Sequence, residues 1–300
     1  MNKENTDEIM AADPVFYRER DMDCTRTNMC WGLECGDGWK KPLLELAKKT
    51  SVLNGLLAPL NMCIVGKQVK SKFADLRVYW DMQPLEGDDA PELDEHQLEL
   101  VETISAMLDD AVNSAESECE VTCEKCGFHG NALFDEIVTC GSWLTHYCRP
   151  CAQKRQRNAG RITAYNEGFE YLGPFAEGKI YDGDEKYGCF MGLYYSKLHP
   201  EMKSVFRNIA SPRDVQAIAV DMGLAIADES ALAPMREALE LKFGNEDMKK
   251  RLLDTGELEI CGMNRCHENF WGGCCCEKCG ELPHLNHYGK LLMDIRSRLK

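Results

Sequence analysis

The chain lacks long apolar runs. No stretch of eighteen apolar residues occurs among its 300 residues, so we expect no membrane-spanning helix. The N-terminal segment, residues 1–7, is polar and acidic and has no apolar core, which excludes a signal peptide and leads us to expect a cytoplasmic protein. No repeat period is visible either, so the sequence does not indicate a solenoid or a propeller.

Positive charge is also scarce. The chain has 35 Lys and Arg against 50 Asp and Glu, which gives a formal net charge of −15. A protein whose main task is to grip a nucleic-acid backbone needs clustered Lys and Arg, so the composition argues against that class. A local basic groove is still compatible with this composition, because Lys154–Arg161 forms one basic run. The length suits about two domains, and 44% hydrophobic residues allow a sizeable core.

Cysteine, in contrast, is abundant, with 17 residues. A reducing compartment disfavours disulfides, so closely spaced cysteines are first interpreted as metal ligands. Cys123-x-x-Cys126 and Cys148-x-x-Cys151 lie twenty-one residues apart, and two such knuckles can surround zinc with four thiolates. We therefore predict a structural zinc site there. The alternatives are four unrelated thiols or a redox pair, for which no adjoining βαβ pattern is visible.

A second zinc site is predicted around Cys276-x-x-Cys279, with Cys274 joining from the same loop. Its fourth ligand stays open among His284, His287, Cys266 and Cys261. The alternative is a set of free thiols in a turn. Further cysteines are expected to be core thiols, because free cysteine is commonly buried; these are Cys24, Cys30, Cys35 and Cys63.

The periodicity of apolar residues predicts an α+β fold. We expect a flexible segment over 1–20, a zinc-binding module over 21–158 and a second domain over 165–300. The second domain is expected to be mainly helical with a few short strands, and the first to be a small zinc-stapled α/β domain. Helices are predicted over 42–59, 96–117, 185–198, 212–222, 231–243, 245–254 and 287–299, and strands over 76–80, 169–172, 179–181 and 257–261.

Four motifs follow one another in the C-terminal region: Lys242-Phe243-x-Asn245, Leu252-Leu253-x-Thr255-Gly256, His267-Glu268-x-x-Trp271-Gly272 and Asn286-x-x-Gly289-Lys290-Leu291-Leu292-Met293. In this order they resemble the C-terminal half of the NADAR superfamily, the NAD- and ADP-ribose-associated proteins that include YbiA-type N-glycosidases. The similarity covers roughly Phe169–Leu299, and Glu185-x-Tyr187 resembles the family's first acidic station.

The resemblance implies cleavage of a bond between a ribose carbon and a base nitrogen. Such cleavage builds positive charge on the sugar, which a carboxylate stabilises, while an acid can protonate the departing base. An indole face can hold the flat base. On this resemblance the catalytic residues are Glu185, Glu268, Trp271 and Asn286, and the substrate-binding residues are Tyr187, Gly272, Gly289 and Lys290.

Each of these residues also has an ordinary structural interpretation. Glu185 alone is typical of a solvated helix acid, Trp271 of a core aromatic and Asn286 of a helix cap. The order and spacing of the motifs together carry the inference.

Three positions depart from the family pattern. Glu268 stands where relatives usually have Asp, and catalytic distances tolerate little such change. Gly192 stands where relatives often have a Lys, which some members are thought to use covalently on an opened ribose. Residues 227–230 hold Glu229 but no Trp, so part of an aromatic clamp is missing.

We therefore predict an N-glycosidase that removes ADP-ribose from modified DNA or RNA, with structural zinc and no redox cofactor or membrane partner. Residues 36–151 resemble an uncharacterised module of phage proteins, which favours a nucleic-acid substrate in a counter-defence role. Three alternatives stay open: hydrolysis of a phosphorylated riboflavin-pathway intermediate, binding of an ADP-ribose-like nucleotide without turnover, and a zinc-stapled interaction module with an inactive domain.

Overall fold

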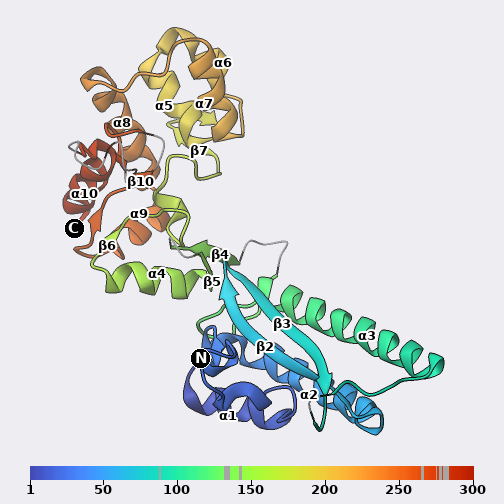
Figure 1. The fold of residues 1–300 in the computed structure, drawn as a ribbon. Helices are drawn as coiled ribbons and strands as arrows, with labels where there is room; N and C mark the ends of the chain where they lie inside the picture. The colour runs from blue at the N-terminus through green and yellow to red at the C-terminus, as the bar shows by residue number, and fades with distance from the viewer. Residues whose placement is uncertain are drawn as a thin grey trace. The chain divides into compact units, whose positions relative to one another are not determined.

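The computed structural model describes residues 1–300 except 88, 132–135, 142–143, 265–266, 275, 277–278 and 280–283. The chain divides into two compact units, Met1–Ala152 and Gln153–Lys300 (Figure 1). The division falls within α4 (Arg149–Asn158), which contains most of the basic run. In the described ranges, no helix combines the length and the apolar character needed to cross a bilayer. The mixture of helices with short strands confirms the α+β prediction.

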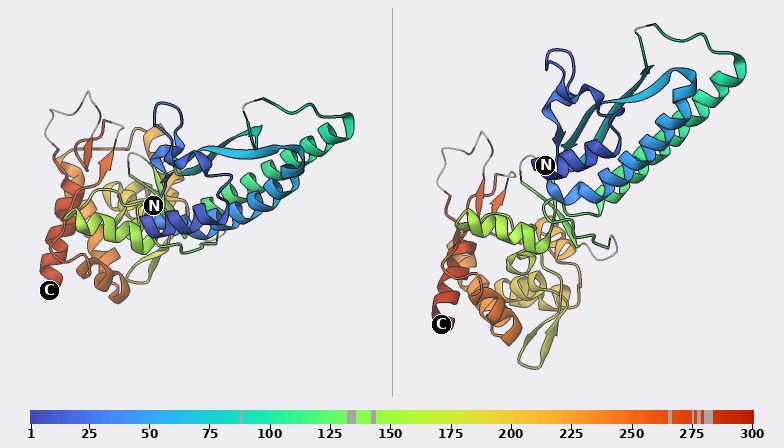
Figure 2. Two further views of the ribbon diagram at one scale, coloured as in Figure 1. Left: turned by 60° about the horizontal axis from the view of Figure 1, so that its bottom comes forward. Right: turned by 90° about the horizontal axis from the view of Figure 1, so that it is seen from below.

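A long hairpin and two long helices form the first unit (Figures 1 and 2). β2 (Met62–Lys72) and β3 (Asp75–Pro84) pair antiparallel, and β1 (Leu33–Glu34) pairs parallel with β2. α2 (Lys40–Leu57) packs beside β2, and α3 (Glu95–Glu120) packs beside β3 and α2. This layer of hairpin on helices encloses the core of the unit.

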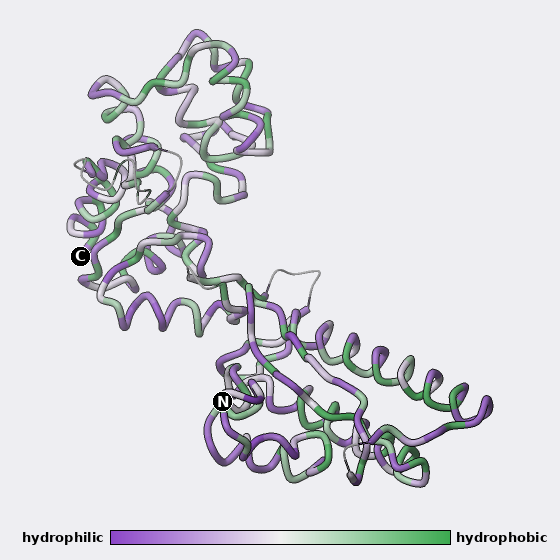
Figure 3. Tube along the Cα trace, in the orientation of Figure 1, coloured by the Kyte–Doolittle hydropathy of each residue, from purple (hydrophilic) through white to green (hydrophobic). Residues whose placement is uncertain are grey.

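Apolar periodicity explains both long helices. Polar and apolar residues alternate along α3 (Figure 3), whose buried side includes Ile104, Leu108 and Val112. Asp94 and Gln97 form a reciprocal capping box at its start. The helices predicted over 42–59 and 96–117 and the strand predicted over 76–80 are thereby confirmed.

The N-terminal segment is ordered, which corrects the prediction of a flexible stretch over 1–20. α1 (Lys3–Ala12) buries Ile9 in the core of the first unit. Buried Asn54 donates from Nδ2 to Asp13 Oδ2 over 3.1 Å and accepts from the Ile64 amide over 2.7 Å. Because this amide side chain joins three segments, the N-terminal residues are tied to α2 and β2.

The remaining elements of the first unit are short. β4 (Ile137–Cys140) and β5 (Thr145–Cys148) form an antiparallel pair that leads into α4. Single 3-10 turns complete the unit: η1 (Arg18–Asp21), η2 (Met29–Trp31), η3 (Asp37–Trp39) and η4 (Ala58–Leu60).

The second unit is mainly helical. Its helices after α4 are α5 (Phe190–Leu198), α6 (Lys203–Phe206), α7 (Pro212–Asp221), α8 (Leu232–Phe243), α9 (Glu246–Leu253) and α10 (His287–Leu299), with 3-10 turns η6 (Glu170–Leu172), η7 (Pro200–Met202) and η8 (Glu229–Ala231). Two-stranded pairs join β6 (Arg161–Ile162) to β9 (Glu259–Ile260), β7 (Ile180–Asp182) to β8 (Glu185–Tyr187), and β10 (Met263–Asn264) to β11 (Gly273–Cys274). One core unites these elements around α5, α8 and α10.

Two sequence predictions for this unit are wrong in part. Glu185 lies in β8 and not in a helix, because Gly183 turns the chain with φ 58° and α5 begins only after Cys189. The stretch 169–172 is a 3-10 turn and not a strand, since Leu172 N bonds to Phe169 O. The other predicted helices, and the strands around 180 and 260, are present with shifted ends.

Candidate functional site

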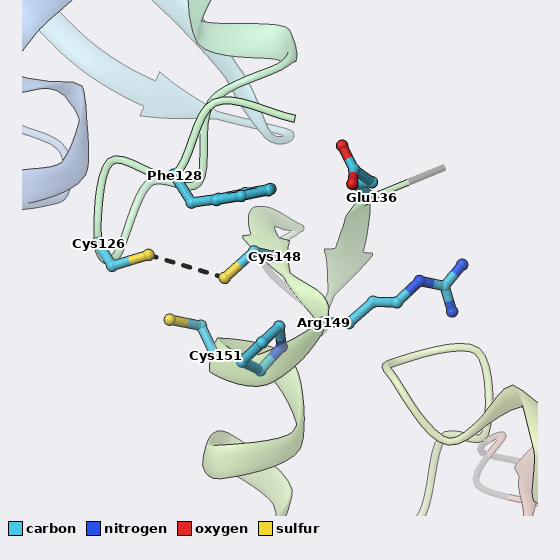
Figure 4. Close-up of a pocket in the computed structure, with 7 residues that line it drawn as sticks. Cys126, Phe128, Glu136, Cys148, Arg149 and Cys151 are labelled. Atoms are coloured by element: carbon cyan, nitrogen blue, oxygen red, sulfur yellow. Dashed lines mark hydrogen bonds between the residues drawn. The ribbon is translucent and has the colours of Figure 1, made fainter. Parts of the chain in front are cut away.

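Cys123, Cys126, Cys148 and Cys151 converge as predicted, and we call them the four-cysteine cluster. Their four sulfur atoms lie within 4.8 Å of one another, and Cys126 Sγ is 3.7 Å from Cys148 Sγ. Figure 4 shows three of these thiols directed toward one another from the turn after α3, from β5 and from α4. Zinc–sulfur bonds of about 2.3 Å in a tetrahedron place sulfurs roughly 3.8 Å apart, so the group fits zinc.

The Gly36–Trp39 motif packs directly against this cluster. Gly38 N donates to Glu124 O over 2.8 Å, and buried Trp39 donates from Nε1 to Thr122 O over 3.0 Å. A Cβ on Gly38 would lie 2.0 Å from Cys123 O. The motif therefore has a packing explanation: only glycine allows the chain to approach the knuckle this closely.

A cavity of about 360 Å³ adjoins the four-cysteine cluster (Figure 4). Its wall includes the exposed ring of Phe128 and the side chains of Glu136, Arg149 and Pro150 as well as three of the cysteines. Burial raises the pKa of Cys148 to about 11, so this thiol resists ionisation without metal, and bound metal would supply the compensating charge.

A second cluster forms from His267, Cys274, Cys276 and Cys279, and we call it the cysteine–histidine cluster. All four ligand atoms lie within 4.8 Å of one another. His267 Nδ1 is 3.2 Å from Cys279 Sγ and 3.3 Å from Cys276 Sγ. Three thiols and one imidazole are a usual zinc ligand set.

His267 was not among the residues predicted for the fourth position of this cluster. Of the predicted alternatives, Cys261 contacts Met263 and His287 contacts Phe270, while Cys266 lies outside the described residues. His284 is exposed and packs beside Gly273. The available signal was the spacing His267-x6-Cys274-x-Cys276-x2-Cys279, which places a histidine at the start of the same loop.

The four cysteines predicted to be core thiols divide into two kinds. Cys24 and Cys30 form a disulfide, which corrects the prediction of core thiols at these positions. Cys35 and Cys63 are free and buried, as predicted.

Glu268 follows His267 and uses both carboxylate oxygens on main-chain amides. Oε1 accepts from Phe270 N over 2.8 Å and from Trp271 N over 2.7 Å, and Oε2 accepts from Gly272 N over 3.0 Å. In this arrangement Glu268 shapes the loop 268–272, and its carboxylate has no oxygen free of a partner.

The carbonyls of the same loop cap the start of α10. Four consecutive amides, those of Leu285, Asn286, His287 and Tyr288, donate to the carbonyls of Asn269, Gly272, Phe270 and Trp271 over 2.9–3.2 Å. Those of Asn286, His287 and Tyr288 would otherwise be unpaired donors of a helix N-terminus. We call this arrangement the loop–helix lock. It joins the two most recognisable motifs of the C-terminal region.

Asn286 and two glycines make this lock tight. Asn286 has φ 48° and donates from Nδ2 to Ile260 O over 2.9 Å, and its side chain makes no helix-capping hydrogen bond. A Cβ on Gly272 would lie 2.2 Å from Gly262 O, and one on Gly289 would lie 2.0 Å from Ile260 O. These three residues therefore have a clear role in backbone packing, in addition to the roles in catalysis and substrate binding that the sequence predicts for them.

Trp271 belongs to an aromatic group at the lock. Its ring is edge-on to Phe270 at 4.9 Å and to Tyr194 at 6.2 Å between centroids, and Phe270 lies 4.5 Å from the ring of His287. His287 and Lys290 in turn line a cavity of about 570 Å³ between α8 and α10. Its other lining residues are Glu229, Leu232, Ala233, Arg236, Glu237, Leu291 and Asp294.

Glu185 is held as a carboxylate at some remove from the lock. It forms a short ion pair with Lys203, an ion pair with Arg207 at 3.9 Å, and accepts from Tyr187 Oη over 3.2 Å. The hydrogen bond from Lys203 lowers the pKa of Glu185, so this side chain stays ionised. Across the described ranges, its hydrogen bonds and ion pairs do not reach Glu268 or Trp271.

Gly192 and the basic run have structural explanations. A Cβ on Gly192 would lie 2.7 Å from Phe206 O, so this helix has no space for the lysine of the family pattern. In the basic run, Arg155 pairs with Glu167 over 2.7 Å and Arg157 donates to Asp254 O over 2.8 Å. Two of its cations thus serve packing within the second unit.

Comparison with known proteins shows a similarity to a solved structure. No protein-family model and no curated protein matches the chain. Among solved structures, the NMR structure of the E. coli protein YbiA matches 46% of this chain and 83% of its own, with 19% identity and a TM-score of 0.38. A likeness at this level does not assign a function, so the function has to be inferred from the chain's own side chains.

Proposed function

We propose that the C-terminal unit is an N-glycosidase that hydrolyses the bond between a ribosyl carbon and a base nitrogen. The observation that carries the proposal is the loop–helix lock, because it brings together the residues of two motifs on which the family resemblance depends. Gly272 and Gly289, which the motifs require, both lie where a side chain would meet a carbonyl oxygen. The motif residues thus have one shared physical reason to occur in this order.

Glu185 is the carboxylate that we assign to the sugar. Lys203 and Arg207 favour its ionised form, and an ionised carboxylate can stabilise positive charge that develops on the ribose. In the reaction the carbon–nitrogen bond breaks, a water oxygen bonds to the ribose carbon, and a proton passes to the departing base. Glu185 fits the stabilising role better than that of general acid, which has to carry a proton.

The aromatic group and the cavity between α8 and α10 supply a binding surface. Trp271 is half-buried beside Phe270, and the cavity of about 570 Å³ is in the range of small-molecule sites. Lys290 and Arg236 are the cations that this wall offers to a phosphate-bearing ligand, although Arg236 is paired with Asp294 and the wall also holds Glu229 and Glu237. We propose ADP-ribose attached to a nucleic-acid base as the substrate, with a phosphorylated riboflavin-pathway intermediate as the competing substrate.

Two observations favour a second candidate, a nucleotide-binding protein without turnover. Gly192 excludes a lysine at the family position, and the Glu268 carboxylate is fully engaged by amides. Both features leave ligand binding intact while removing groups that chemistry would use. Glu268 and Asn286 then serve as positioning residues, and Glu185 and Trp271 carry the contacts with the ligand.

The test is to incubate the full-length protein with ADP-ribosylated DNA, NAD, ADP-ribose or a riboflavin-pathway intermediate and to identify products by mass spectrometry. The proposal expects free base and a released ribosyl product from one substrate. Bound ligand without product would support the second candidate.

Glu185→Gln keeps the shape of the side chain and removes its charge, so we expect it to abolish turnover and to preserve the fold. Glu201→Gln is the matched control, because Glu201 is an exposed acid in the same unit whose only described ion pair is with His199 at 3.7 Å. Equal turnover in the two variants would remove Glu185 from the site.

A further inference from the structure

The ligands of the cysteine–histidine cluster enclose the loop of the candidate site. His267 directly precedes Glu268, and Cys274 follows Gly273 in β11. The segment between these two ligands is the loop 268–272, which carries Trp271. Any ion that holds His267 against the three cysteines therefore fixes both ends of this loop.

The backbone at His267 supplies a second, independent observation. His267 has φ 65°, a left-handed conformation that non-glycine residues adopt uncommonly. Its ring is exposed, so core packing does not impose this conformation. The conformation places Nδ1 beside two sulfurs, at 3.2 and 3.3 Å, close to the roughly 3.6 Å expected between a nitrogen and a sulfur on one zinc ion.

Hydrogen bonds to main-chain atoms connect the loop 268–272 to the start of α10. Glu268 holds the amides of residues 270–272, and the carbonyls of residues 269–272 hold the amides of residues 285–288. Cys274 N donates a hydrogen bond to Asn269 Oδ1 over 2.8 Å, which ties the loop back to a ligand. The contacts from the cluster to the first turn of α10 are continuous.

We propose that His267 completes a zinc site with Cys274, Cys276 and Cys279, and that zinc at this site positions the loop 268–272 on α10. The zinc has a positioning role: it contacts neither the ribose nor the base, and it holds Trp271 and the first turn of α10 where the ligand binds. The last part of this inference, the effect on the ligand, rests on the proposed function. The metal site and its effect on the loop do not.

The test compares the full-length wild type with His267→Ala and His267→Cys. Zinc per chain is counted by native mass spectrometry, and amide protection is measured by hydrogen exchange. We expect about two zinc ions in the wild type, about one in His267→Ala, and about two again in His267→Cys, which restores four ligands. Amides of residues 270–272 and 285–288 should exchange roughly tenfold faster or more in His267→Ala and return to wild-type rates in His267→Cys.

Exchange of amides outside the loop 268–272 and α10 distinguishes a general loss of folding from a local effect. Amides of α5 lie in the same core and should keep their protection in His267→Ala. Loss of zinc with unchanged exchange in residues 270–272 and 285–288 would overturn the positioning role. Two zinc ions retained in His267→Ala would overturn the assignment of His267 as ligand, as would loss of protection throughout the unit with no recovery in His267→Cys.

Turnover and binding assays on the same three proteins distinguish this inference from the proposed function. If zinc controls loop protection and no substrate yields product, the inference holds and the glycosidase proposal fails. If the wild type turns over substrate and His267→Ala is unchanged in zinc content, exchange and turnover, the glycosidase proposal holds and the inference fails.

Discussion

The two cysteine-rich clusters have similar ligands and the same burial, with two buried, one half-buried and one exposed ligand in each, but they lie in different parts of the fold. The four-cysteine cluster adjoins the core of the first unit, where Cys123 is buried and Gly38 and Trp39 bond to the knuckle. The cysteine–histidine cluster lies on a loop, and its histidine is exposed. The comparison suggests two purposes for similar ligand sets: bound metal at the first cluster would join the end of α3 to β5 and α4, and bound metal at the second would hold a loop.

The largest expected effect tests whether the four-cysteine cluster stabilises the first unit. Replacing both Cys126 and Cys148 by Ser should remove zinc from the four-cysteine cluster and unfold the first unit, because structural zinc contributes about 10–16 kcal/mol in small zinc domains. Hydrogen exchange should show loss of protection in α2 and α3. A first unit that keeps its protection without zinc would make the two clusters equivalent and break the comparison.

The next largest effect on stability is expected from substitution of the glycines beside the two clusters. Gly38→Ala should destabilise the first unit by several kcal/mol, because the new Cβ would lie 2.0 Å from Cys123 O and the backbone has to shift. Gly272→Ala meets Gly262 O at 2.2 Å and should open the loop 268–272 with less effect on global unfolding. Urea unfolding checks both changes.

Gly55→Ala is the control for these glycines. Gly55 lies inside α2 with nothing within 4 Å of a new Cβ, so alanine should stabilise the unit by about 1 kcal/mol. If Gly38→Ala matches this control, the close packing on the knuckle has no energetic weight.

A buried lysine predicts how the second unit responds to pH. Lys242 is buried between aromatic rings, donates to Gly173 O over 2.9 Å, and burial lowers its pKa from 10.5 to about 7. Between pH 7 and 10.5 the unfolded chain therefore binds more protons at this residue, and its contribution to stability rises with pH. Lys242→Met should be more stable than the wild type by a few kcal/mol at pH 7, and the difference should shrink toward pH 10.

Thermal or urea unfolding at several pH values checks this result. Lys250→Met, which removes an exposed lysine of α9, is the control and should follow the wild-type profile. A Lys242→Met variant whose advantage stays constant with pH would mean that Lys242 stays charged in the folded protein over this range, as it does in the unfolded chain.

The smallest effect concerns the pH dependence of the proposed reaction. Lys203 lowers the pKa of Glu185, so the ionised carboxylate persists as pH falls. Lys203→Met should raise that pKa and move the acid limb of the kcat/KM profile to higher pH. Lys186→Met, on the exposed side of β8, should leave the limb in place. An unmoved limb in Lys203→Met would show that Glu185 does not control the rate.

Much of the fold follows from local patterns in the sequence. Regular apolar spacing predicted α2, α3 and α10 because each buries one continuous face. The four-cysteine cluster followed from its two knuckles, which carry all four ligands in a recognisable spacing. These features depend on residues that lie near one another in the chain.

The features that the sequence did not reveal depend on contacts between distant segments. The place of Glu185 in a strand follows from the turn at Gly183, and the ordered N-terminus follows from the buried Asn54 bonding to Asp13 and Ile64. The engagement of Glu268 by amides could not be predicted from its motif, since the family pattern describes residue type and not bonding. His267 was missed because a single histidine before a cysteine run has no standard spacing.

The loop–helix lock also decides how a phosphate could be bound. Helix N-termini are common anion sites because their first amides are free to donate. The amides of residues 285–288, which run from just before α10 into its first turn, already donate to carbonyl oxygens, so these four donors are occupied toward an incoming diphosphate. A nucleotide in the adjoining cavity would depend on side-chain cations such as Lys290 instead, and its affinity would accordingly fall with added salt.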